Sequence, residues 1–430
     1  MHASVSHRIT ILYHFFHPDD VVSARHFSDL AVGLHERGWQ VLAVPSNRQC
    51  HEGGTKYPSR ETWGNIEIRR VSRPAFSQSR NMGRIANSAW MITKWSWFFL
   101  WRRPKSTEVV IVGTDPVLAV LGVLLWSFIS PKLRFAHWCF DMYPEAPIAD
   151  GLLRENSFLV RWLKWFLAKA YGRCDLIADL GGCMKSLLLR YQPKAKLTTL
   201  VPWALVEPRQ PVPMDGATRK SLFGDARLGL LYSGNFGRAH DYDRFLELAR
   251  LLRGESIHFC FAVRGNRASE LRAAIGPEDA NVSIAGFASE SELEKRLGAC
   301  DLHLVSLRES WTGAVVPSKF FGAIAAGRGV IFAGSNQSAI ASWINEYSLG
   351  WVLDGTNTAQ VAQRLREISS DPKELESQKL RCHTTYAERF SKSIQLDLWN
   401  QELRALLGNQ QSGKSQIPNA QIREDAPIVV

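Results

Sequence analysis

The chain has 430 residues, of which 45% are hydrophobic and 22% are charged, as in a folded globular protein. This composition excludes a disordered chain, and the length favours two domains of roughly 200 residues each. Residues 1–200 contain 26 Lys and Arg against 15 Asp and Glu, and residues 201–430 contain 26 against 26, so the net charge of +11 lies in the first half. This asymmetry indicates an anionic surface or partner for one domain only.

Cysteine spacing and hydropathy exclude other classes. The seven cysteines are widely spaced and form no C-x-x-C pair, which favours a reducing compartment over a disulfide framework or a zinc site. The N-terminal apolar run meets His, Pro and Asp instead of a cleavage site, so it predicts a strand and not a signal peptide. The apolar run at 117–129 is too short to cross a bilayer and predicts a buried helix.

The first half alternates predicted strands and helices. A strand at 8–15 precedes an amphipathic helix at 23–38 and a strand at 39–46, and further strands are predicted at 66–71, 109–113, 134–138 and 176–180. This alternation predicts a parallel sheet covered on both faces. Residues 1–201 are therefore assigned to an N-terminal Rossmann-like domain.

A linker is predicted at 202–216, which contains four prolines and no hydrophobic periodicity. The second domain, 217–388, has predicted strands at 228–234, 257–263, 282–286, 302–307, 329–334 and 350–355. A helix at 389–408 is expected to pack back toward the N-terminal domain, and the tail at 409–430 to be disordered. The predicted fold class is α/β, with two Rossmann-like, doubly wound parallel-sheet domains facing across a cleft.

Phosphate-binding chemistry is indicated in the second half only. The loop after the first strand has no glycine, which argues against a dinucleotide site, and no P-loop occurs. In contrast, Gly234-Asn235-Phe236-Gly237 lies between a strand and a helix, where main-chain amides can approach an anion. Loops at Arg264 and Phe287 follow the next strands. Each turn taken alone has an ordinary tight turn as its alternative.

The stretch 313–334 reads GAVVPSKFFGAIAAGRGVIFAG and places Ser318 and Lys319 at the start of a predicted helix. A helix N-terminus presents free amides and attracts phosphate. An ordinary helix-strand unit with a surface lysine is the alternative. The phosphate interpretation is favoured because this segment and the three loops should converge on one sheet edge.

The ordered segments YSGNFGRAHD, FAVRGN, GFASESEL and VPSKFFGAIAAGRGVI resemble the nucleotide-sugar half of retaining glycosyltransferases of family 4, which share the GT-B fold. The segment FFHPDDVVSARHFSDLAVGLHERGWQVLAV resembles the opening of that family. HWCFDMYPEAPIADG resembles the D-x-x-P-E segment of relatives that build bacterial surface polysaccharides, the colanic-acid-type branch. The resemblance covers about residues 8–405.

The resemblance implies donor-side roles. It implies binding of a UDP- or GDP-linked sugar by Gly234, Asn235, Gly237, Arg238, Arg264, Phe287, Gly313, Ser318 and Lys319, with Lys319 also stabilising the leaving nucleotide. Many relatives carry two glutamates eight positions apart where this chain has Ala314 and Gly322. Many also carry Lys or Arg after the G-N-x-G turn, where this chain has Arg238, His240 and Asp241.

Acceptor-side residues are expected in the first half. Asp141 and Glu145 are candidate catalytic carboxylates, with helix capping and a solvated side chain as the alternatives. Asp19, Asp20, Ser23 and His137 are further acceptor-side candidates, for which a turn and a core histidine are the alternatives. The resemblance implies front-face attack without an enzymatic nucleophile. No metal and no other cofactor is predicted.

Two segments in the basic half combine tryptophan with Lys and Arg, at 89–103 and 157–173. Such segments suit a membrane interface, and a buried helix with a solvated stripe is the alternative. The predicted function is transfer of a sugar, with retention, to a polyprenyl-diphosphate-linked acceptor at the cytoplasmic membrane face, for surface polysaccharide assembly. A nucleotide-sugar 2-epimerase and a basic nucleic-acid-binding protein are the alternatives, and no nucleic-acid partner is predicted.

Overall fold

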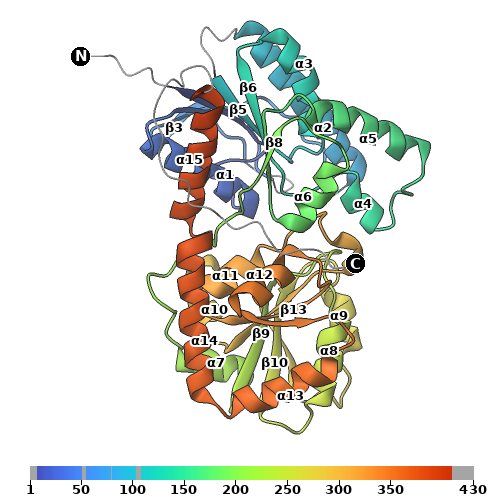
Figure 1. Ribbon diagram of the computed structural model, residues 1–430, viewed down its shortest axis with the longest axis vertical. Coiled ribbons are helices and arrows are strands. Elements are labelled where there is room, and N and C mark those ends of the chain that lie inside the picture. The colour runs from blue at the N-terminus through green and yellow to red at the C-terminus, as the bar shows by residue number, and fades with distance from the viewer. Residues whose placement is uncertain (1–6, 51–54, 79, 103–107, 409–430) are drawn as a thin grey trace.

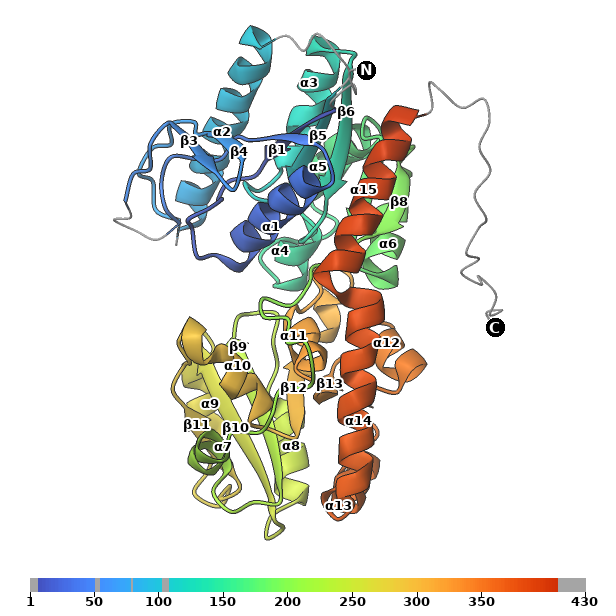
Figure 2. The same ribbon diagram turned by 90° about the vertical axis from the view of Figure 1, so that its left-hand side faces the viewer.

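The computed structural model describes residues 7–50, 55–78, 80–102 and 108–408. The predicted disordered tail, 409–430, lies outside the described residues. Two lobes lie one above the other, each built from one sheet with helices around it (Figures 1 and 2). This is the predicted architecture of two parallel-sheet α/β domains.

The first lobe contains an eight-stranded sheet in the order β3-β4-β2-β1-β5-β6-β7-β8. Its strands are β1 (Arg8–Leu12), β2 (Gln40–Ala43), β3 (Arg60–Trp63), β4 (Ile66–Arg69), β5 (Glu108–Gly113), β6 (Leu133–Trp138), β7 (Leu176–Asp179) and β8 (Lys196–Thr199). All neighbours are parallel except β3, which runs antiparallel to β4. The sequence analysis did not predict β3 and β8, because RETW and KLTT lack the apolar run of a central strand.

Helices cover both faces of this sheet. They are α1 (Val22–Glu36), α2 (Asn81–Trp101), the 3₁₀ turn η1 (Ala119–Leu121), α3 (Gly122–Ile129), α4 (Glu145–Ala149), α5 (Phe158–Tyr171) and α6 (Gly182–Leu189). The helix predicted as buried at 117–129 is buried on one side only, since Phe128 of α3 is 70% exposed. Within the described ranges, no helix has both the length and the apolar character needed to cross a bilayer.

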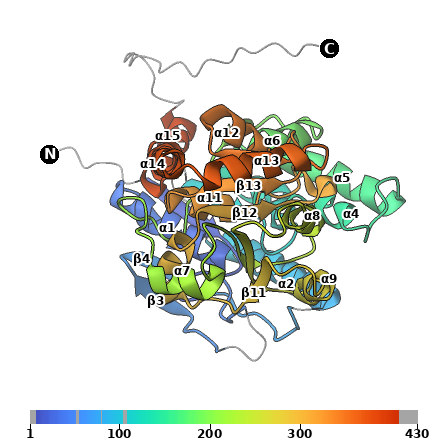
Figure 3. The same cartoon turned by 90° about the horizontal axis from the view of Figure 1, so that it is seen from below.

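The second lobe contains a six-stranded, wholly parallel sheet in the order β11-β10-β9-β12-β13-β14. Its strands are β9 (Leu228–Asn235), β10 (Ile257–Arg264), β11 (Val282–Ala285), β12 (Leu302–Ser306), β13 (Gly329–Ala333) and β14 (Gly350–Leu353). The helices are α7 (Gly216–Phe223), α8 (Asp243–Leu251), α9 (Ala268–Ala274), η2 (Glu290–Glu292), α10 (Leu293–Gly298), η3 (Glu309–Trp311), α11 (Lys319–Ala325), α12 (Ala339–Tyr347) and α13 (Thr358–Ser369). Seen from below, α8 and α9 lie on one side of the sheet and α7 and α11 on the other (Figure 3).

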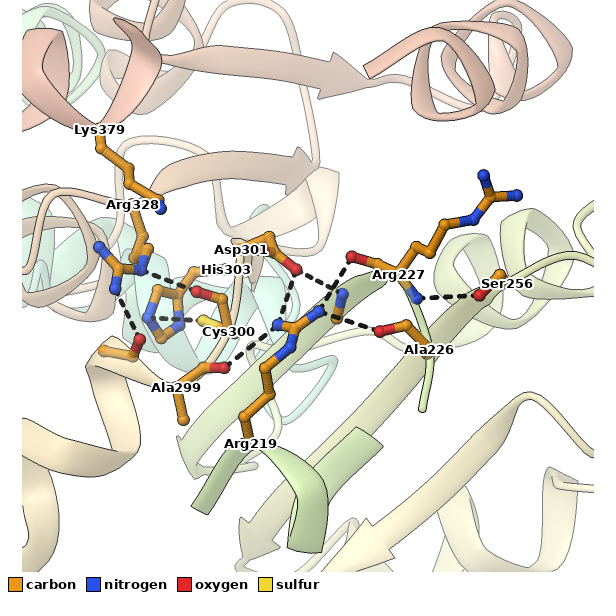
Figure 4. A network of polar contacts seen from close by, with 12 residues as sticks. Arg219, Ala226, Arg227, Ser256, Ala299, Cys300, Asp301, His303, Arg328 and Lys379 are labelled. Atoms are coloured by element: carbon orange, nitrogen blue, oxygen red, sulfur yellow. Dashed lines mark hydrogen bonds and ion pairs between the residues drawn. The ribbon is translucent and has the colours of Figure 1, made fainter. Parts of the chain in front are cut away.

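A polar network fixes the end of this sheet where the strands begin (Figure 4). Arg328 is 1% exposed and donates to five carbonyl oxygens, including those of Val212 and Cys300. Nearby, Arg219 donates to the carboxylate of Asp301 at 2.8 Å. The arginine between the two glycines of the GRG segment therefore ties the strand-entry end of the lobe together. The opposite end of the sheet, formed by the carboxyl ends of the strands, faces the first lobe.

The chain crosses between the lobes twice. Residues 200–215 form no helix or strand, and the chain returns through α14 (Pro372–Thr385), the π-helical turn η4 (Tyr386–Phe390) and α15 (Lys392–Gly408). Figure 1 shows α14 and α15 in red, running along both lobes. In α15, Trp399 is fully buried and Asn400 accepts a 2.9 Å hydrogen bond from the indole of Trp39. The C-terminal helix thus belongs to the core of the first lobe.

Candidate functional site

A cleft of about 570 Å³ lies between the lobes. It is lined by Tyr13, Asp20, Val21, Val22, Ser23, His26, Phe140, Asp141 and Pro202 on one side, and by Asn235, Arg264, Val316 and Ser318 on the other. The second set comes from strand ends and the loop before α11, because the carboxyl ends of parallel strands share one sheet edge. Six residues predicted from sequence line the cleft: Asp20, Ser23, Asp141, Asn235, Arg264 and Ser318.

Lys319 and Gly234 meet at the donor-side wall. Gly234 has φ of +133°, a conformation that favours glycine, and a Cβ there would lie 2.7 Å from Cε of Lys319. The ammonium group lies 5.5 Å from the ring centroid of Tyr232. Burial lowers the pKa of Lys319 to about 8. The glycine turn therefore lets the lysine side chain pass closely over the end of β9.

The Lys319 ammonium group is held by a histidine that the sequence analysis did not include among the donor residues. Nζ lies 3.1 Å from Nε2 of His240, and Nδ1 of His240 lies 2.8 Å from the carbonyl oxygen of Ser306. A carbonyl only accepts, so Nδ1 carries the proton and Nε2 accepts from Lys319. Burial, with Lys319 and Arg267 adding to it, lowers the pKa of His240 to about 3 and keeps the ring neutral. Its place three residues after Gly237 was the available sequence signal.

The loop after β10 closes against the same turn. Gly265 has φ of +126°, and a Cβ there would lie 2.6 Å from Oδ1 of Asn235. The guanidinium of Arg264 stacks over Phe287 at 4.0 Å from the ring centroid, and Phe287 is 45% exposed. The predicted loops at 234–237, 264–267 and 286–287 therefore meet at one edge of the lobe.

Six predicted donor residues are not among those that line the cleft: Gly234 and Lys319, which meet beside it, Phe287, which lies against Arg264, and Gly237, Arg238 and Gly313. Arg238 forms an ion pair with Asp150 of the first lobe at 2.5 Å. Gly313 has φ of +82°, and a Cβ there would lie 2.7 Å from the carbonyl oxygen of Cys183 in α6. Gly237 lies within the turn itself. The structure thus places Arg238 and Gly313 at contacts between the two lobes. Arg238 forms an ion pair across the contact, and Gly313, which has no Cβ, lets the two main chains approach closely.

Asp141 lies where the lobes touch. The amide of the next residue, Met142, donates to the carbonyl oxygen of Ala314 at 2.8 Å, so the two loops are joined by main chain. Burial, and then the charge of Asp115, raises the pKa of Asp141 to about 6. Ala314, which stands where many members of the resembled family carry a glutamate, is 2% exposed.

Glu145 and Asp19 lie outside the cleft lining. Oε1 of Glu145 accepts a 2.6 Å hydrogen bond from the hydroxyl of Tyr191, on the flank of the first lobe. Asp19 is 4% exposed and accepts a 2.8 Å hydrogen bond from the amide of Cys50. Asp19 thus fits its alternative of a turn residue, whereas Glu145, with a side chain only 14% exposed, is not the solvated side chain of its alternative.

His137 is a buried histidine of β6. Its Nδ1 donates to the carbonyl oxygen of Val112 at 2.9 Å, and burial lowers its pKa to about 4. His137 and Asp141 both line a second, much smaller pocket, and His137 does not line the main cleft. Asp20 and Ser23 are therefore the acceptor-side candidates of the first loop that face the cleft.

The sequence analysis missed Tyr13, His26 and Phe140, all of which line the cleft. His26 follows Ser23 by three residues, so both lie on one face of α1. That spacing was the signal available for His26. Tyr13 and Phe140 follow β1 and β6 and had no polar pattern to mark them.

No family model matches the chain. Over 275 residues it is 26% identical to the probable glycosyltransferase WbjE of Pseudomonas aeruginosa, an alignment that covers 62% of this chain and 67% of the relative. This relative is similar over more than half of the chain.

Solved structures share the fold over nearly the whole chain. Sucrose-phosphate synthase of Thermosynechococcus elongatus superposes with a TM-score of 0.70 at 12% identity, covering 94% of this chain and all of that one. Anabaena HepE in complex with UDP gives 0.63 at 11%, with coverage of 94% and 100%. WaaG, a glycosyltransferase involved in lipopolysaccharide biosynthesis, gives 0.61 at 14%, with coverage of 91% and 98%. The chain therefore shares the GT-B fold of these glycosyltransferases, and its similarity to a probable glycosyltransferase supports a transferase enzyme.

Proposed function

We propose that this protein transfers a sugar from a nucleotide-sugar donor to a polyprenyl-diphosphate-linked acceptor, with retention of anomeric configuration, in surface polysaccharide synthesis. The observation that carries the proposal is the meeting of Lys319 with the Gly234 turn beside the cleft between the lobes. The UDP bound by the structurally similar HepE supports a nucleotide donor. The D-x-x-P-E resemblance and WaaG support a surface-polysaccharide role.

In this proposal the second lobe stabilises the leaving diphosphate. The bond from the anomeric carbon to the phosphate oxygen breaks, and negative charge grows on that oxygen. Lys319 and the main-chain amides near Gly234 and Ser318 supply fixed positive charge and dipoles for it. His240 accepts from one Lys319 proton and so directs the remaining two away from itself.

The first lobe holds the acceptor. Its hydroxyl attacks on the face that the diphosphate leaves, which gives retention, and its proton passes to the departing phosphate oxygen. Asp141 hydrogen-bonds to the acceptor hydroxyl as a carboxylate and orients it. The main-chain bond from Met142 to Ala314 keeps Asp141 beside the donor-side wall.

A donor panel tests this proposal. UDP-glucose, UDP-galactose, UDP-N-acetylglucosamine, GDP-mannose and GDP-fucose are mixed singly with the protein, and melting temperature is recorded. A donor present at 100 times its Kd should stabilise the fold by about 2.7 kcal/mol. That donor should also release its nucleoside diphosphate when bacterial lipid extract is added. Intact donors throughout the panel would contradict the proposal, and a changed sugar without acceptor would identify an epimerase.

The acceptor surface is argued from α2, α3 and α5, which lie together at one end of the first lobe (Figure 1). Their exposed apolar side chains and the cations among them form what we call the aromatic-basic face: Trp97, Leu100, Trp101, Leu125, Phe128, Phe158, Leu159, Trp162 and Trp165, with Lys94, Lys169 and Arg173. Arg173 stacks over Phe128 at 4.7 Å and Lys169 over Trp165 at 5.5 Å. Exposed tryptophans beside cations suit the headgroup region of an anionic membrane.

Removing three of these rings should weaken membrane binding. We expect the triple variant Trp101→Ser, Phe128→Ser and Trp162→Ser to lose at least tenfold in affinity for phosphatidylglycerol vesicles, measured by co-sedimentation. These side chains are 81%, 70% and 52% exposed, so the melting temperature should change little.

A matched control carries Leu251→Ser and Leu380→Ser, which remove exposed apolar side chains from the second lobe. It should bind vesicles as the wild type does. Equal binding by the triple variant, or no vesicle binding by the wild type, would contradict the membrane proposal.

A further inference from the structure

His26 is a buried side chain in the wall of the cleft whose hydrogen-bonding capacity is unused. It is 1% exposed, and within the part of the chain that the structure describes neither ring nitrogen has a hydrogen-bond partner. By contrast, His137 bonds to the carbonyl of Val112 and His303 to that of Leu297. A buried polar group without a partner destabilises the fold. We therefore expect such a group in the wall of a cleft to find its partner in a bound ligand.

The imidazole of His26 is neutral. Burial, with the charges of Arg25 and Lys392 adding to it, lowers its pKa to about 3. A neutral ring has one N–H donor and one acceptor nitrogen. A sugar hydroxyl also donates and accepts, so hydroxyls of a pyranose can satisfy both nitrogens. The diphosphate of a nucleotide sugar is fully ionised at neutral pH, so it only accepts hydrogen bonds and would leave the acceptor nitrogen unpaired.

The surroundings of His26 fit a sugar. The ring stacks near Phe140 at a centroid distance of 6.0 Å and meets the edge of Trp203 at 5.5 Å, so its orientation is fixed. Ser23 and Asp141 line the same cleft and add polar oxygens beside an aromatic ring. Asn235, Arg264 and Ser318, the residues suited to phosphate, come from the second lobe.

We propose that His26 binds hydroxyl groups of a saccharide held in the cleft and thereby contributes to sugar selectivity. This inference rests on the proposed transferase function and deepens it. The hydroxyls can belong to the donor sugar or to the acceptor saccharide, which share this chemistry. Two arms of one experiment separate these sources.

The test compares His26→Phe, which keeps an aromatic ring and removes both nitrogens, with His26→Gln, which keeps a donor and an acceptor. In the donor arm, Kd is measured for each nucleotide sugar of the panel that binds and for the corresponding free nucleotide, UDP or GDP. If the donor sugar is the ligand, His26→Phe should bind the free nucleotide as the wild type does and lose tenfold or more for the nucleotide sugar. In the acceptor arm, an unchanged donor Kd with a tenfold higher KM for lipid extract assigns the acceptor saccharide.

The stability of the unliganded protein gives a readout that a structural histidine would not produce. His26→Phe should melt at a higher temperature than the wild type, because it removes two unpaired buried nitrogens. The matched control His303→Phe removes a buried histidine that has partners at Leu297 and Cys300 (Figure 4) and does not line the cleft. It should melt at a lower temperature and keep wild-type binding. His26→Gln should retain most of the sugar selectivity.

The two levels of the argument fail in different ways. A wild type that binds none of the donors contradicts the proposed transferase. A wild type that binds a donor, together with a His26→Phe variant of equal donor Kd and equal acceptor KM, overturns only the role of His26.

Discussion

Replacing Lys319 with methionine should reduce kcat/KM for sugar transfer by about 10²–10³, the usual effect of removing one preorganised group that stabilises charge in a transition state. Methionine keeps an unbranched chain of similar length and removes the charge. Two opposing effects act on the stability of the unliganded variant, because methionine removes an ammonium group that burial disfavours and leaves Nε2 of His240 without its donor. Nucleoside diphosphate release under steady-state conditions measures the effect.

The pH dependence of kcat/KM checks the same residue. The free protein should lose donor capture as pH rises through about 8, where Lys319 gives up its proton, and the methionine variant should lack this limb. The exposed Lys220 of the same lobe, changed to methionine, serves as control and should keep full activity. Wild-type turnover by Lys319→Met would remove the lysine from the proposed mechanism.

Changing Asp141 to asparagine should lower kcat by about 10²-fold, the usual cost of misplacing a reacting group, because the acceptor hydroxyl loses the carboxylate that orients it. Wild-type activity should fall as pH decreases through about 6, because the carboxylate then becomes protonated and can no longer accept from the acceptor hydroxyl. The asparagine variant should not show this fall in activity at low pH. Initial rates between pH 5 and 8 provide the measurement.

Stability should move in the opposite direction from activity at this position. The pKa of Asp141 is raised, so its ionised form destabilises the fold above pH about 6 and its protonated form, at low pH, does not. Asp141→Asn should therefore raise the melting temperature at pH 8 and leave it nearly unchanged at pH 4.

Glu145→Gln tests the other carboxylate of the DMYPE segment and should keep kcat, since Glu145 bonds to Tyr191 outside the cleft. Loss of activity in that variant alone would reverse the assignment.

The donor-side wall was predictable because it depends on topology. Asn235 and Arg264 end neighbouring parallel strands, so they lie at one sheet edge whatever the details of packing. The small residues around Lys319 indicated a closely packed helix, and Gly234 indicated a turn without a Cβ. Chain order and strand direction were enough to bring these positions together, and the proximity of Gly234 to Lys319 follows that expectation.

Other features depended on contacts between segments distant in sequence. Arg238 pairs with Asp150 across 88 positions, and Trp39 with Asn400 across 361, which no local pattern reveals. The strands β3 and β8 were missed because their residues are polar, and their place at the sheet edges comes from pairing with a neighbour.

The sequence by itself determined two parallel-sheet domains, the cleft between them and most of its donor-side wall, because hydrophobic periodicity and strand-end glycines act through local geometry. The tertiary structure alone decided which polar groups are buried, paired or left without a partner. Burial sets the pKa values of Lys319, His240 and Asp141 and leaves His26 unsatisfied, and burial is a property of the packed lobes. The charge state of the candidate site therefore follows from the packing of segments that lie far apart in the sequence.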